Sequence, residues 1–101
     1  MTARSTKGDK KRAAIYREAA RRIERKLNYC CCYAIRRITG NHKLGDEMRE
    51  VFAARRIQEN RWSGHWMVEI GEMRYGESAE VQNRRILALC FMAAMVEAGD
   101  A

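Results

Sequence analysis

The residues best suited to chemistry are cationic side chains that recur between residues 10 and 26. Arg17, Arg21 and Arg25 are spaced at i, i+4 and i+8, which places them on one side of a helix. A planar guanidinium donates paired hydrogen bonds to phosphate or carboxylate groups. The sequence therefore predicts an anion-binding or nucleic-acid-binding face made of Lys10, Lys11, Arg17, Arg21, Arg22, Arg25 and Lys26. The alternative is a solvated helix face without a ligand, which is what most charged stripes are.

A second group of candidates lies in a stretch punctuated by glycines, where Trp62, His65 and Trp66 follow Arg61. Exposed aromatic side chains would form a stacking platform or the centre of a protein interface. Buried ones would close one end of the hydrophobic core, and we expect at least one tryptophan to be buried. We nevertheless take Arg61, Trp62, His65 and Trp66 as candidates for contact with a partner.

The cysteines Cys30, Cys31, Cys32 and Cys90 raise the question of a metal site or a nucleophile. Three consecutive residues on a helix project about 100° apart, so the triplet cannot direct all its thiols at one metal. A reactive thiol would also need a defined acid or base, and the sequence has no phosphate-binding glycine loop and no clustered carboxylate pair. We expect reduced, structural thiols, no metal, no cofactor and no enzymatic activity.

The charge of the chain is unevenly distributed. The 101 residues carry 20 Lys and Arg against 13 Asp and Glu, a net charge of +7. Residues 1–43 account for 13 − 3 = +10, and residues 44–101 for 7 − 10 = −3. Such asymmetry indicates either an anionic partner for the N-terminal half or a contact between copies of the chain. The excess of arginine over lysine also fits a GC-rich genome, so it decides nothing by itself.

The cationic residues must be positioned by a helix that follows an N-cap at Asp9. Ile15, Ala19, Ile23 and Leu27 recur every four residues and form its apolar stripe. Residues 1–8 are expected to be a flexible basic arm, and residues 9–101 a single helical domain.

Further helices are expected over 29–39, capped by Asn28 and ended by Gly40, and after a cap at Asp46. Ser78 is expected to cap the last helix, and Gly99 to end it. Residues 86–96 are apolar on every side, so this helix should be the central one. The sequence predicts a mainly α fold, a compact four-helix domain around a buried C-terminal helix. One short β-hairpin near 62–75 is also compatible with the alternation there.

Two apolar blocks carry a resemblance to known proteins. The block 29–35 reads YCCCYAI and the block 85–95 reads RILALCFMAAM, with a tryptophan-containing loop between them. Together they resemble small orphan proteins encoded by bacteriophages and prophages. The resemblance implies an accessory protein that inhibits a host defence system, as an anti-CRISPR protein or a sponge for signalling nucleotides does.

We therefore expect a non-enzymatic phage accessory protein that acts by stoichiometric binding through its basic helical face. The face would occupy a site meant for nucleic acid or hold an anionic nucleotide, and the partner would be a host defence protein or ribonucleoprotein. The alternatives are a transcriptional regulator that binds nucleic acid, and a structural or assembly oligomer. No apolar run is long enough to span a bilayer, so we expect the protein in the cytoplasm of the host bacterial cell.

Overall fold

The computed structural model describes residues 6–28, 30–55 and 79–101. Within these ranges the chain forms four helices and no strand. The helices are α1 (Lys7–Glu24), α2 (Cys31–Thr39), α3 (Lys43–Ala54) and α5 (Ala79–Glu97). The predicted mainly α class is confirmed, and the described residues contain four helices, as many as expected. The hairpin expected near 62–75 and the cap expected at Ser78 lie outside the described residues.

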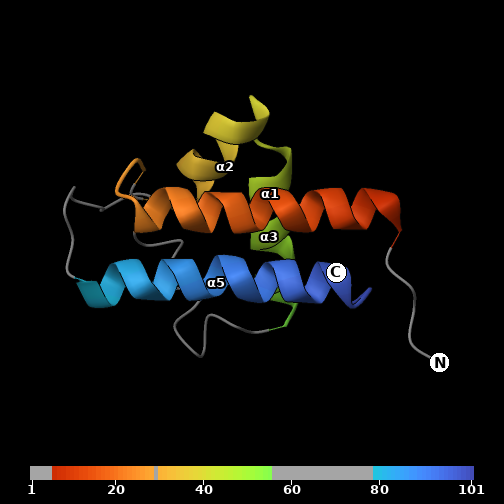
Figure 1. Cartoon of the computed structure of the whole chain (residues 1–101). Coiled ribbons are helices and arrows are strands. Elements are labelled where there is room, and N and C mark those ends of the chain that lie inside the picture. The colour runs from red at the N-terminus through yellow and green to blue at the C-terminus, as the bar shows by residue number, and fades with distance from the viewer. Residues whose placement is uncertain (1–5, 29, 56–78) are drawn as a thin grey trace.

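Helices α1 and α5 form the main layer of the fold. They lie side by side and run in opposite directions, and α1 packs more extensively on α5 than on any other described helix (Figure 1). Helix α3 crosses behind this pair, and α2 packs mainly on α1 and also contacts α5 (Figure 1). The outward side of α1 is left uncovered by the other described helices.

Helix α1 begins three residues earlier than the sequence predicted. Thr6 is its N-cap: the Thr6 hydroxyl accepts a hydrogen bond from the Asp9 main-chain N–H at 3.0 Å, and the Thr6 N–H donates to the Asp9 carboxylate at 3.0 Å. Asp9 is thus the third helical residue of a capping box, and its prediction as the N-cap is wrong. Lys7 and Gly8 belong to the helix rather than to a basic arm, and residues 1–5 lie outside the described part of the chain.

Helix α1 ends in a tight reversal at Lys26, whose φ of 61° lies in the left-handed region. The Lys26 N–H donates to the Ile23 carbonyl at 3.0 Å, and the Leu27 N–H donates to the Arg22 carbonyl at 2.9 Å. These two bonds make a Schellman motif, which satisfies carbonyl groups at the helix end. Leu27 therefore leaves the helix and is 56% exposed, which corrects the prediction that it extends the apolar stripe.

The other expected caps are placed differently. Helix α2 starts after Cys30 without a side-chain cap, because the expected cap Asn28 is buried and bonded to α1. Helix α3 starts at Lys43, whose N–H donates to the Asn41 side-chain oxygen at 3.0 Å. The expected cap Asp46 consequently lies inside the first turn of α3. The expected end of α2 at Gly40, with φ of 81°, is confirmed.

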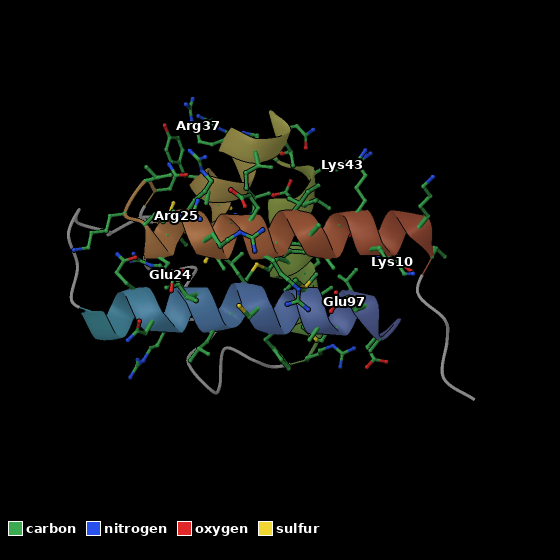
Figure 2. All side chains as sticks on the ribbon, in the orientation of Figure 1. Lys10, Glu24, Arg25, Arg37, Lys43 and Glu97 are labelled. Atoms are coloured by element: carbon green, nitrogen blue, oxygen red, sulfur yellow. The ribbon has the colours of Figure 1, made fainter. Side chains whose placement is uncertain are left out.

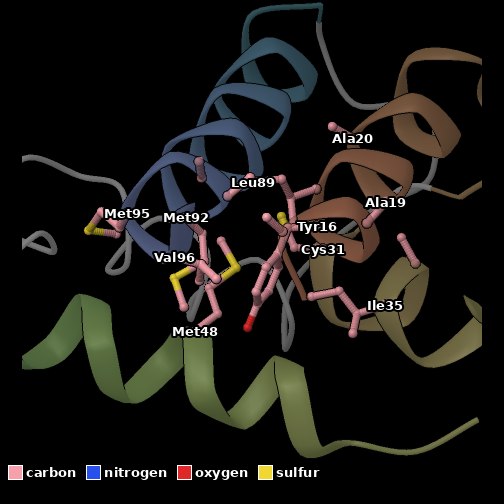
Figure 3. Close-up of a cluster of buried hydrophobic side chains, with 14 of the residues drawn as sticks. Tyr16, Ala19, Ala20, Cys31, Ile35, Met48, Leu89, Met92, Met95 and Val96 are labelled. Carbon is pink, nitrogen blue, oxygen red and sulfur yellow. The ribbon is translucent and has the colours of Figure 1, made fainter. Parts of the chain in front are cut away.

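The hydrophobic core lies where α3 crosses the α1–α5 pair. Tyr16 of α1, Met48 of α3 and Met92 of α5 converge in it, and all three are fully buried (Figure 3). Ile35 and Cys31 of α2 close its other side (Figure 3). Side chains from all four helices therefore hold the outer face of α1 in one orientation.

The C-terminal helix is buried on one face rather than on every side. Leu89, Met92 and Val96 are fully buried, whereas Leu87 is 56% and Phe91 48% exposed. The Phe91 ring lies 6.3 Å from that of Phe52, centroid to centroid, so one side of it packs on α3. Helix α5 packs mainly on α1 among the described helices, and this contact buries only the stripe facing it. None of the described helices combines the length and apolar character needed to cross a membrane.

Candidate functional site

The structure places the predicted cationic residues around the uncovered side of α1. The Lys10, Lys11 and Arg21 side chains of the helix are exposed, as are Arg25 and Lys26 at its C-terminal end. Arg17 and Arg22 are partly buried. Lys10 and Arg25 lie towards opposite ends of α1 (Figure 2). The predicted residues thus extend along the whole helix.

Three of the predicted residues already have partners within the protein. Arg17 forms an ion pair with Glu97 of α5, and Arg21 forms one with Glu18 at 2.8 Å. The Arg22 Nε donates to the buried Asn28 side-chain oxygen at 2.5 Å. Arg17 and Arg22 therefore connect α1 to other parts of the fold. The sequence predicted all three as equivalent anion ligands, because spacing within one helix does not reveal partners from other elements.

The remaining cations on this side are available to a ligand. Lys7, Lys10, Lys11, Arg25 and Lys26 are exposed, and none forms an ion pair with another described residue. The sequence predicted that Lys7 belongs to a flexible basic arm over residues 1–8, but it lies in the first turn of the helix. We define these five residues, together with Arg21, as the basic surface. Arg21 is included because an exposed ion pair contributes at most about 1 kcal/mol and can be exchanged for a phosphate contact.

Carboxylates mark one border of the basic surface. Glu24 lies on the side of α1 that faces α5, and Glu97 of α5 lies along the same seam (Figure 2). A phosphate close to this seam would meet negative charge. The potential of the basic surface is therefore directed outward from α1, away from α5.

Three further exposed cations lie beyond α1. Arg36 and Arg37 occupy the last turn of α2, and Lys43 begins α3. The Arg36 guanidinium lies 5.6 Å from the centroid of the Tyr33 ring, a cation–π contact on an exposed surface. The sequence predicts no binding role for Arg36 and Arg37, because cations at a helix C-terminus interact favourably with the helix dipole. The three cations provide a matched comparison for the basic surface.

A polar network holds α1 in its orientation. Arg12 donates to Asp9 at 2.6 Å and to Glu47 of α3 at 2.5 Å. The hydrogen bond from the Thr6 N–H and then that from Arg12 lower the pKa of Asp9 below its ordinary value. The ionised carboxylate is therefore the form that the folded helix terminus stabilises. The network links the first turns of α1 to the α3 helix.

The four cysteines are free thiols that are buried or partly buried within the fold. Cys31 is buried and its thiol donates to the Arg85 main-chain carbonyl at 3.7 Å, and Cys30, Cys32 and Cys90 are partly buried. Burial raises the pKa of the Cys32 thiol, and the nearby Arg49 opposes that shift. A raised pKa keeps the thiol protonated at neutral pH, which disfavours nucleophilic chemistry. Within the described residues no three His, Cys, Asp or Glu side chains are grouped as metal ligands.

The predicted partner-contact group, Arg61, Trp62, His65 and Trp66, lies outside the described residues. Of the two predicted groups, the structure therefore places only the cationic residues between 10 and 26. Comparisons of the chain with models of protein families, with curated proteins and with solved structures find no match.

Proposed function

We propose that the protein acts by stoichiometric binding, with the basic surface of α1 in contact with the phosphate backbone of a nucleic acid. The observation that carries this proposal is a set of exposed cations on α1 and directly after it that form no ion pair with another described residue: Lys7, Lys10, Lys11, Arg25 and Lys26. Contacts of this kind release condensed counterions from nucleic acid and supply most of the affinity in binding without sequence specificity.

The distribution of acidic residues on α1 supports a ligand rather than a generally solvated helix. A solvated surface usually mixes charges of both signs. Here Asp9 is engaged in the helix cap and Glu18 in the pair with Arg21. Glu24 lies towards α5 (Figure 2). The outward side of α1 therefore keeps its positive potential.

The positive charge of the basic surface favours a nucleic acid as its ligand. It disfavours a protein site that itself binds nucleic acid. A cleft built for RNA or DNA is itself basic and would repel this surface. If the protein counteracts a host defence system, as its resemblance to phage accessory proteins implies, its ligand would be the RNA or DNA of that system. The protein would then act by covering the nucleic acid, with no chemical step.

Fluorescence anisotropy with labelled RNA and DNA over a range of salt concentrations tests the proposal. The logarithm of the association constant should fall linearly with the logarithm of salt concentration. Reversing charge at Lys11, Arg21 and Arg25 together, to Glu, should abolish binding at 100 mM salt. The matched variant carries the same charge change at Arg36, Arg37 and Lys43, and it should retain most of the affinity.

Both variants must first show the helical circular dichroism of the parent protein. Equal loss of affinity in the two variants would mean that overall charge, not the basic surface, controls binding. No binding of any nucleic acid at low salt would reject the proposal. A salt-sensitive increase in the mass of the protein alone, measured by light scattering, would then support assembly between copies instead.

A further inference from the structure

The basic surface consists of two clusters at the two ends of α1. Lys7, Lys10 and Lys11 form the N-terminal cluster, and Arg21, Arg25 and Lys26 form the C-terminal cluster. Figure 2 shows this separation, with Lys10 and Arg25 near opposite ends of the helix.

The outer face between the clusters carries no available cation. Counting from Lys7, the positions i+7 and i+11 fall on the same side of the helix, and they hold Ala14 and Glu18. Ala14 is exposed, and Glu18 is partly buried and paired with Arg21. Arg17, which lies between the clusters in the sequence, is drawn towards α5 by its ion pair with Glu97. The centre of the face is therefore small and contributes no positive charge of its own.

The distance between the clusters fits the geometry of a duplex. At a rise of 1.5 Å per residue, Lys11 and Arg21, the facing edges of the two clusters, have Cα atoms about 15 Å apart along the helix axis. The major groove of B-form DNA is about 12 Å wide, with a phosphate strand on each rim. A helix lying across such a groove would place one cluster over each rim and the centre of the face over the opening.

We propose that α1 lies across a groove of a double-stranded nucleic acid, with one cationic cluster on each of the two phosphate strands. This inference rests on the proposed function, because it requires that the ligand be a nucleic acid. The contacts are with phosphates, so the protein recognises the shape of the duplex rather than its sequence.

A single strand fits the same surface less well. Proteins that bind single strands combine a continuous basic track with aromatic side chains on which bases stack. Of the described aromatic residues, Tyr16 is buried, Tyr33 lies on α2 and Phe91 on α5, so the described outer face of α1 has no stacking side chain. A phosphate track that followed α1 would also pass the Glu18 carboxylate.

The test measures how much each cluster contributes to the affinity for a duplex and for the corresponding single strands. One variant replaces Lys7, Lys10 and Lys11 with Gln, and a second replaces Arg21, Arg25 and Lys26 with Gln. Binding is measured by anisotropy with a labelled DNA duplex, an RNA duplex and the corresponding single strands, at several salt concentrations. The matched control replaces Arg36, Arg37 and Lys43 with Gln, and circular dichroism confirms that each variant is folded.

The parent protein should bind a duplex at least tenfold more tightly than the single strand. Each cluster variant should lose at least tenfold in duplex affinity, and its slope of log affinity against log salt should fall by up to about 2.7, which corresponds to three lost phosphate contacts. The control should change affinity less than threefold. The DNA and RNA arms identify the form of duplex that is preferred.

Two results would overturn the inference while leaving the proposed function intact. One is equal or tighter binding of the single strand, and the other is a loss of affinity from only one of the two clusters. No binding of any of the four nucleic acids at low salt would reject the inference and the proposed function together.

Discussion

The Tyr16 hydroxyl of α1 and the Glu47 carboxylate of α3 lie 2.8 Å apart at the crossing of the two helices. The same hydroxyl is 2.8 Å from the Leu44 main-chain carbonyl, and its single proton can be donated to one of these two oxygens at a time. Glu47 also accepts from Arg12. Burial, followed by the hydrogen bond with Glu47, raises the pKa of Tyr16, so the hydroxyl stays protonated and remains a donor. This contact fixes α3 against the inner face of α1.

Replacing Tyr16 with Phe should lower the free energy of unfolding by about 1–3 kcal/mol, because the partly buried acceptors on Leu44 and Glu47 lose their donor. Urea denaturation followed by circular dichroism measures the change. Tyr33→Phe is the matched control: Tyr33 is 43% exposed and its ring retains the contact with Arg36, so the effect should stay within about 0.5 kcal/mol. Equal effects of the two substitutions would contradict the role assigned to the Tyr16 hydroxyl.

The capping box of α1 should make stability depend on acid pH. The pKa of Asp9 is lowered in the folded protein, so its contribution to stability is full above its ordinary pKa of about 3.9. The contribution is lost as the pH falls through the lower folded value. Asp9→Asn should therefore be less stable than the parent protein at pH 6, and the two should converge near pH 2. Urea midpoints at a series of pH values test this, and a constant difference at all pH values would contradict it.

The left-handed conformation of Lys26 should be relieved by glycine. A non-glycine residue in this conformation costs about 1–2 kcal/mol, and part of this is offset by the greater freedom of glycine in the unfolded chain. Lys26→Gly should raise the free energy of unfolding by about 1 kcal/mol, seen as a rise in Tm of several degrees. Arg25→Gly is the control, because Arg25 has a φ of −84° and gains nothing from glycine. A lower Tm for Lys26→Gly would contradict the described reversal.

The register of α5 can be tested with two leucines in the same helix. Leu89 is fully buried and Leu87 is 56% exposed. Leu89→Ala should cost about 2–5 kcal/mol, because it leaves a cavity in the core. Leu87→Ala should cost less than about 1 kcal/mol, since little apolar area is lost. A larger loss for Leu87 than for Leu89, measured by urea denaturation, would show that α5 is rotated from the position described.

The amino-acid sequence by itself determined the helical class and five of the six residues of the basic surface, all except Lys7. A proline-free chain with apolar residues at helical spacing has few alternatives to helices, and Ala19 and Ile23 of the predicted apolar stripe are buried. Gly40 and Gly99 were correctly expected at helix ends, and both have positive φ angles. These features depend on local backbone preferences, which are encoded over a few neighbouring residues.

The tertiary structure decided which cations remain available and which face of α5 is buried. Arg17 is paired with Glu97, a residue 80 positions away, and no spacing within α1 reveals that contact. The helix caps were also decided by the folded structure. Thr6, not Asp9, caps α1, and Asp9 completes the capping box as the third helical residue. Asn28 accepts a hydrogen bond from Arg22 instead of capping α2. Leu87 and Leu89 are the same residue type, and only the packing of α5 against α1 and α3 distinguishes them. Contacts between distant segments form in the folded chain alone, so the sequence pattern carries no direct record of them.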